Sequence, residues 1–143
     1  MMIYLMRGLP ASGKSYESDI ILTENLINDN ISVVRINKST LRQMLWPKHE
    51  WTPAFEKIIL DLEETIAIYF FKLKKNIIID STNLLSKDVT KWHKTAKKYK
   101  QKLKIIDLRK IPLDVCLTRD IKRENSCGPT IILKLARDGD LLK

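Results

Sequence analysis

The sequence is poor in cysteine and in glycine, and each shortage narrows the classes of protein that it can encode. Its 143 residues include two cysteines and four glycines. Cys116 and Cys127 form neither a C-x-x-C pair nor the spacing of a zinc site, which excludes a disulfide framework and a cysteine-based metal centre. We therefore expect two free thiols in a reducing compartment.

Long apolar runs are also missing. No run approaches the roughly 18 residues that cross a bilayer, and the N-terminus lacks the basic, apolar and small-residue regions of a signal peptide. The sequence predicts a cytoplasmic protein with no membrane partner, in the host cytoplasm if the source is a phage.

Acidic residues are fewer than basic ones. The chain has 17 Asp and Glu against 26 Lys and Arg, for a formal net charge of +9. Such an excess favours a polyanionic partner, because neutralising phosphates releases their counterions. Lysine is densest over residues 87–104. This stretch would also be typical of an ordinary solvent-exposed face that has no anionic partner.

Two of the four glycines belong to one motif. Residues 8–15 fit the pattern G-x-x-x-x-G-K-[ST] of a phosphate-binding P-loop. Gly8 and Gly13 permit the tight backbone whose N–H groups surround phosphate oxygens. Lys14 is expected to reach the β- and γ-phosphates, and Ser15 to ligate Mg²⁺. The predicted nucleotide-binding set also includes Pro10, Ala11 and Ser12.

Strand-like and helical segments alternate along the chain. Apolar, β-rich stretches cover residues 2–6, 31–36, 76–80 and 103–108. Helical patterns cover residues 14–29, 51–73, 87–102, 113–123 and 130–137. This alternation predicts an α/β, doubly wound P-loop NTPase fold, a single domain over residues 1–143 with about four parallel strands flanked by helices. Trp92 falls on a helical pattern and is expected in the core.

Polar residues follow the third predicted strand. Residues 77–80 read as three isoleucines and an aspartate, a Walker-B-like pattern in which Asp80 holds Mg²⁺ directly or through water. Thr82 and Asn83 come next, and they either contact an acceptor or only shape the turn. Because ligands of such sheets bind beyond the carboxyl ends of the strands, we expect the motifs to converge on one site.

Two arginines follow the fourth predicted strand. Arg119 and Arg123 are four residues apart, which would place them on one helix face. Phosphoryl transfer spreads negative charge over the moving group, and arginines stabilise that charge. This region is also where a C-terminal helical lid is expected to fold over the nucleotide.

Together these blocks resemble the P-loop polynucleotide 5′-hydroxyl kinase family, including the kinase domain of the phage enzymes. The resemblance rests on residues 8–15, on INKSTLRQ at 36–43, on IIIDSTNL at 77–84, and on RDIKR at 119–123. It implies transfer of the γ-phosphate of ATP or another NTP, with Mg²⁺, to the 5′-OH of DNA or RNA in nucleic-acid repair. It also implies that Arg42 binds the acceptor phosphate and that Arg123, with Arg119, stabilises the transition state. The second, phosphatase domain of the phage enzymes is not expected here.

The chain departs from that family at one position. The family has Asn-Arg-Asp after the second strand, and this aspartate accepts the proton of the 5′-OH; the corresponding block here is Asn37-Lys38-Ser39. A serine is not a general base at neutral pH, and such a base contributes roughly 10²–10⁴-fold. The chain is then a slow kinase, a kinase whose base is Asp80 or Asp19, a degenerate binder, or the carrier of a deliberate substitution.

Two further functions stay open at the level of sequence. One is a P-loop kinase whose acceptor is a small-molecule hydroxyl or a modified base in DNA. The other is a module that binds NTP or nucleic acid without catalysis. The residues do not choose between DNA and RNA, name the donor triphosphate or fix the oligomeric state.

Overall fold

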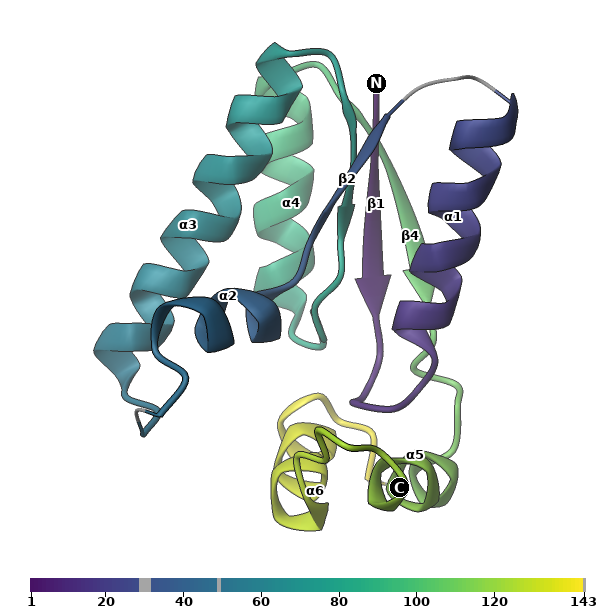
Figure 1. Ribbon diagram of the computed structural model, residues 1–143, viewed down its shortest axis with the longest axis vertical. Helices are drawn as coiled ribbons and strands as arrows, with labels where there is room; N and C mark the ends of the chain where they lie inside the picture. Colours follow the sequence, from purple (N-terminus) through teal and green to yellow (C-terminus); the bar gives the residue numbers. More distant parts are fainter. Residues whose placement is uncertain (29–31, 49, 143) are drawn as a thin grey trace.

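A parallel sheet forms the centre of the computed structural model, which describes residues 1–28, 32–48 and 50–142 (Figure 1). The described strands lie in the order β2-β3-β1-β4. They are β1 (Met2–Arg7), β2 (Val33–Ile36), β3 (Asn76–Ile79) and β4 (Lys102–Asp107). The predicted α/β P-loop fold with four parallel strands is confirmed. Of the predicted second strand, residue 31 lies outside the described residues.

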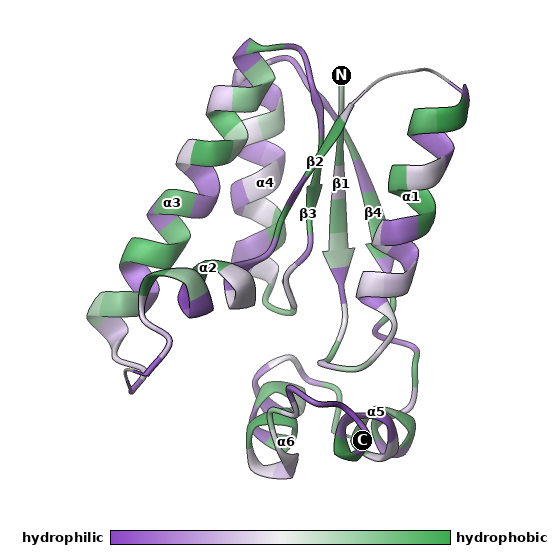
Figure 2. Ribbon diagram, in the orientation of Figure 1, coloured by the Kyte–Doolittle hydropathy of each residue, from purple (hydrophilic) through white to green (hydrophobic). Residues whose placement is uncertain are grey.

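Alternation along the central strands divides the core between the two faces of the sheet. Ile3 and Leu5 of β1 are fully buried on one face, and Met6 is fully buried on the other. In β3 the side chains of Ile77, Ile78 and Ile79 are all fully buried, as expected for a strand covered on both faces. Figure 2 shows β1 largely in the colours of apolar residues.

Helices cover the two faces unequally (Figure 1). Residues of α3 and α4 pack on the face that carries Ile3 and Leu5, whereas Ile21 of α1 packs on the opposite face with Met6. The helices are α1 (Lys14–Asn28), α2 (Lys38–Leu45), α3 (Pro53–Lys72), α4 (Ser86–Lys98), α5 (Leu113–Ile121) and α6 (Pro129–Asp138). None of the described helices has the length and apolar character that a bilayer crossing requires.

Helix α2 was not anticipated from the sequence. It begins where Asn37 ends β2, because the Asn37 side-chain oxygen accepts a hydrogen bond from the backbone N–H of Thr40 at 2.9 Å. Leu41 then turns into the core cluster. Eight residues, about two turns, with one buried residue give too little periodicity to be detected, although the capping asparagine was a readable signal.

The predicted helix over residues 87–102 ends too late. Helix α4 stops at Lys98, and Lys100 has a φ of 53° in the left-handed region. The N–H of Gln101 donates to the carbonyl of Ala96 at 2.8 Å, and that of Lys100 to Lys97 at 3.3 Å, the hydrogen bonds of a Schellman end. A lysine in place of the usual glycine hid this end from sequence analysis.

Trp92 is the largest fully buried side chain in the core between α4 and the sheet. It is 1% exposed, whereas the next residue, His93, points to solvent. We predict that Trp92→Ala lowers the free energy of unfolding by about 3–5 kcal/mol, because it leaves a cavity in a close-packed core. Urea denaturation should show this loss, with His93→Ala within about 0.5 kcal/mol of the unsubstituted protein. Equal midpoints for the two variants would contradict the placement of Trp92.

Candidate active site

The carboxyl ends of the four described strands open into one cavity of about 1030 Å³, with Leu108 lining it directly after β4. Its walls come from the P-loop, the first turn of α1, the start of α2, the loop after β3, and the end of α5. The cavity brings together twelve of the predicted site residues: Pro10, Ala11, Ser12, Gly13, Lys14, Ser15, Ser39, Arg42, Asp80, Thr82, Arg119 and Arg123.

Close backbone approach explains the first glycine of the P-loop. A Cβ on Gly8 would lie 2.5 Å from Ser12 Oγ and 3.1 Å from Leu108 Cβ, so any larger residue would force the Ser12 side chain to move. The N–H of Gly8 donates to the carbonyl of Thr82 at 3.0 Å and so ties the loop to the end of β3. Gly13 has a φ of 106°, which L side chains rarely adopt. Gly8 therefore shapes the cavity without lining it.

The P-loop carries donors that fit a bound polyphosphate. Lys14 Nζ donates to the carbonyls of Gly8 at 3.1 Å and Leu9 at 2.7 Å, so the ammonium closes the loop on itself. Burial lowers the pKa of Lys14 to about 8. Ser12 Oγ is buried without a hydrogen-bond partner among the described residues. A phosphate at this loop would supply acceptors for both groups.

Asp80 is buried beside the loop and is already neutralised. Its Oδ2 accepts from Arg35 Nε at 2.9 Å, from Arg35 Nη2 at 2.6 Å and from Asn37 Nδ2 at 3.2 Å. The second face of the Arg35 guanidinium pairs with Asp19 at 3.1 Å. One oxygen of Asp80 is therefore committed to protein donors. With the Ser15 hydroxyl lining the same cavity, these oxygens suit Mg²⁺ held largely through water.

The block predicted to bind an acceptor lies on α2. Ser39 is exposed at the start of the helix. Arg42 lines the cavity but forms a fork with Glu56, at 3.0 Å from Nε and 2.7 Å from Nη2. Burial raises the pKa of Glu56, yet the hydrogen bonds and charge of Arg42 outweigh this and hold that pKa below its ordinary value. Glu56 therefore holds the Arg42 side chain in a defined orientation. The sequence did not point to Glu56.

The structure does not place Asn83 with the predicted acceptor site. Asn83 is 2% exposed, has a φ of 43°, and its amide donates to the carbonyls of Met6 at 2.8 Å and Ser81 at 3.2 Å. Its own carbonyl accepts from Arg7 Nε at 2.7 Å. The acceptor-binding prediction for Asn83 is corrected: its amide is spent on shaping the turn, whereas Thr82 does line the cavity.

Arg119 and Arg123 line the cavity from two different segments, a helix and the turn that follows it. Arg119 is in α5, and its Nη1 lies 3.5 Å from the carbonyls of Ala11 and Ser12 in the P-loop. Arg123 lies beyond the helix, which ends at Ile121, so the expectation of one shared helix face is wrong. Both guanidinium groups nevertheless border the same cavity as Lys14.

Asp120 holds the turn that carries Arg123. It is 1% exposed and accepts from Ser126 Oγ at 2.6 Å, from the N–H of Gly128 at 3.0 Å and from Arg123 Nη1 at 3.4 Å. Burial raises the pKa of this carboxyl, but the hydrogen bonds from Ser126 and the backbone of Gly128 and Cys127 outweigh it, so the pKa is lowered. Asp120 was available to sequence analysis only as one member of RDIKR.

Further residues of the cavity wall were not predicted as site residues. Glu17 and Tyr16 line the cavity from the first turn of α1, and Ser81 lines it after β3. Ser81 Oγ donates at 2.9 Å to Glu63, a buried carboxyl whose pKa is raised by burial. Their spacing from the P-loop and from Asp80 could have suggested Glu17 and Ser81, but Glu63 is visible only through the packing of α3.

Comparison with known proteins agrees with this geometry. The family model of an AAA domain, AAA_33, matches residues 3–133. A search of curated proteins found no match.

Solved structures share the fold. A chain from the Pnkp1/Rnl/Hen1 RNA repair complex is 24% identical with a TM-score of 0.78, covering 97% of this chain and 44% of that one. A chain from a second structure of a Pnkp1/Rnl/Hen1 complex is 23% identical with a TM-score of 0.69, and the match covers 90% of this chain and 40% of that one. The Mycobacterium tuberculosis APS kinase CysC, in complex with AMPPNP and APS, is 19% identical with a TM-score of 0.67, and the match covers 85% of this chain and 69% of that one. This chain spans less than half of the chains from the repair complexes, and at these identities the likeness establishes the fold.

The lowered pKa of Lys14 makes nucleotide binding depend on pH. Phosphate favours the ammonium, which the empty site loses as pH rises through about 8. Affinity for ADP should therefore fall by up to about tenfold per pH unit above that value, with a proton taken up on binding. Calorimetry at pH 7 and pH 9, in buffers of different ionisation enthalpy, measures both quantities. Lys14→Arg, whose charge does not titrate, is the control, and an equal pH dependence in that variant would assign the effect elsewhere.

The hydrogen bonds of Asp120 predict a second effect on nucleotide binding. Asp120→Asn keeps the shape of the side chain but replaces an acceptor oxygen with a donor, which the surrounding donors cannot satisfy. Hydrogen bonds to a charged group contribute roughly 1.5–3 kcal/mol, so misplacing Arg123 should weaken ADP binding about tenfold or more. Asp114→Asn, exposed on the first turn of the same helix, should leave affinity unchanged. Comparable losses in both variants would remove Asp120 from this role.

Proposed function

The chain belongs to the AAA domain family AAA_33, and from this premise we propose that it is an ATP-dependent polynucleotide 5′-hydroxyl kinase. Its donor is ATP or another NTP, assisted by Mg²⁺, and its acceptor is the 5′-OH of DNA or RNA. The kinase function follows from a phosphate-binding loop and an arginine pair. The block on α2 and the positive charge of the chain support a polynucleotide acceptor.

One observation carries the proposal: donor and acceptor elements share a single cavity. Lys14 and Ser15 lie at its phosphate end, and Ser39 and Arg42 of α2 face the same space. A volume of about 1030 Å³ is at the upper end of ordinary ligand sites, which suits a nucleoside triphosphate together with the end of an acceptor. A binding site for nucleotide alone would not need Arg42 at its border.

The chemistry that these residues support is an in-line transfer. The acceptor oxygen bonds to the γ-phosphorus while the bond from that phosphorus to the β–γ bridging oxygen breaks, and the hydroxyl proton passes to water. Lys14, Arg119 and Arg123 stabilise the charge on the transferred group, and Arg42 fixes the acceptor through its phosphate. Mg²⁺, when bound near Ser15, neutralises the β- and γ-phosphate oxygens.

The cavity offers no well-placed general base among the residues that the sequence suggested. Asp19 pairs with Arg35 and does not line the cavity, and Asp80 is buried against the same arginine, so neither suits the role of a base. Glu17 is the other described carboxylate on the cavity wall. The proposal is therefore a slow kinase that works by positioning and electrostatics, which supply most of the catalysis in phosphoryl transfer.

The same observation favours a second candidate. A cavity with donor-binding residues and a serine at position 39 suits a domain that binds nucleotide and nucleic acid without transfer. A small-molecule hydroxyl is the other candidate acceptor, because the chain shares its fold with an APS kinase bound to AMPPNP and APS. Support for the polynucleotide acceptor comes from the block on α2 and from the resemblance to a chain of a Pnkp1-containing RNA repair complex.

The test is the transfer of labelled γ-phosphate from ATP to 5′-OH DNA and RNA oligonucleotides in the presence of Mg²⁺. We predict slow transfer that Lys14→Ala abolishes and that Ser39→Asp raises by roughly 10²-fold, the lower end of what a positioned base contributes. Each variant is first shown by circular dichroism to be folded, and Ser39→Asp is also shown to bind ATP.

The outcomes separate the candidates. Transfer that survives in Lys14→Ala would mean a contaminating kinase and would leave the proposal without support. ATP binding with no transfer, in the protein and in Ser39→Asp alike, would favour the non-catalytic module. An unchanged rate in a folded Ser39→Asp protein would show that position 39 is not the place of a base.

A further inference from the structure

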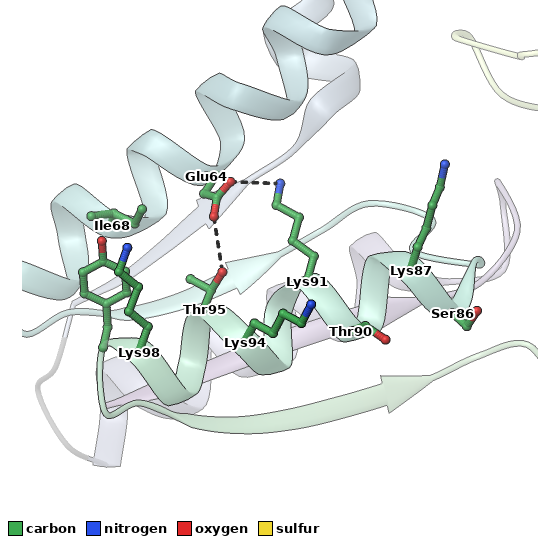
Figure 3. Close-up of a pocket in the computed structure, with 10 residues that line it drawn as sticks. Glu64, Ile68, Ser86, Lys87, Thr90, Lys91, Lys94, Thr95 and Lys98 are labelled. Carbon is green, nitrogen blue, oxygen red and sulfur yellow. Dashed lines mark hydrogen bonds and ion pairs between the residues drawn. The ribbon is translucent and has the colours of Figure 1, made fainter.

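A second hollow, separate from the candidate active site, lies between α3 and α4 (Figure 3). It is an open groove of about 630 Å³. Lys87, Lys91, Lys94 and Lys98 project from α4 along it. Their spacing of four, three and four residues places all four on one face of the helix. At 1.5 Å per residue this lysine row extends for about 16 Å.

Most of the positive charge in the groove is not neutralised. Glu64 of α3 is the acidic residue on its wall, and it is spent on Lys91 at 3.6 Å and on the hydroxyl of Thr95 at 3.3 Å. Among the described residues, no ion-pair partner meets Lys87, Lys94 or Lys98. Like charges at this spacing repel one another and destabilise an isolated helix, so the row has a cost that an anionic ligand would remove.

The groove begins a few residues after the candidate active site along the chain. Ser81 and Thr82 line the active-site cavity, and Ser86 lines the groove four residues after Thr82. Lys87 follows Ser86, so the lysine row begins at the end of α4 that is joined to the active-site loop. The far end carries Tyr99, whose half-buried ring lies against the Lys98 ammonium at 5.4 Å.

From this juxtaposition we infer that the groove between α3 and α4 binds the phosphate backbone of a single-stranded polynucleotide whose 5′ end lies in the active-site cavity. The inference rests on the proposed function for its acceptor. A positively charged groove combined with an aromatic side chain is the usual platform for single strands, because the cations follow the phosphates and the ring stacks on a base.

The experiment measures binding of a fluorescent 12-nucleotide single strand to the full chain over a range of salt concentrations. The test variant replaces Lys87, Lys94 and Lys98 by glutamine and spares Lys91, which holds Glu64. The control variant replaces Lys97, Lys102 and Lys104 by glutamine. These are exposed lysines on the same helix and on β4 that do not line the groove, so both variants lose equal charge.

We expect the test variant to bind the strand at least about tenfold more weakly at low salt, and its slope of log K against log salt to be shallower by about two. The control should change affinity less than about threefold. In the kinase assay, the test variant should raise KM for a 12-nucleotide acceptor and leave kcat, and KM for a 3-nucleotide acceptor, unchanged.

Each remaining outcome decides between the two proposals. Groove-dependent binding without phosphotransfer would remove the kinase function and leave the polynucleotide groove standing. Equal losses in test and control variants would show diffuse electrostatic attraction and overturn the groove. Transfer to short acceptors with no measurable binding of the longer strand would also overturn it, and would direct attention to an acidic protein as the partner of this face.

Discussion

The buried carboxylate of Asp80 is the constraint from which the geometry of the cavity follows. It ends the central strand β3 at 2% exposure, where a lone charge would be too costly to keep. Arg35 at the end of β2 and the amide of Asn37 neutralise it, and the backbone N–H of Asp80 donates to Ile36 at 2.9 Å. Removing either charge would leave its partner stranded, so the ends of two neighbouring strands are fixed to one another.

Asn37 transmits this constraint to the acceptor side. Its amide nitrogen faces Asp80, while its oxygen caps α2 through the N–H of Thr40. The helix that carries Ser39 and Arg42 therefore starts from a point fixed to the Asp80 carboxylate. The elements proposed to bind donor and acceptor are held at a set separation by one side chain, which is the kind of rigidity that a transfer reaction requires.

A residue's role could be predicted from the sequence where that role depends on backbone close to it along the chain. The P-loop, the strand ends and most cavity residues were predicted, because glycine spacing and apolar runs report on backbone near in sequence. Asn83 was misjudged since its amide is consumed by Met6, a partner 77 residues away. Glu56 and Asp120 were missed for a related reason: each acts by orienting an arginine, and no pattern marks a carboxylate for that task.

A serine in place of a base shifts the burden of catalysis onto binding. A kinase without a positioned carboxylate gains rate only from interactions that hold the acceptor oxygen in line with the γ-phosphorus. In the proposed kinase Arg42 would supply one such contact, and Glu56 competes for its guanidinium. In the proposed groove, contacts of the lysine row on α4 with more distant phosphates would add binding energy that does not depend on Arg42. A long acceptor would then be positioned from two places, and the departure at Ser39 becomes compatible with the rest of the cavity.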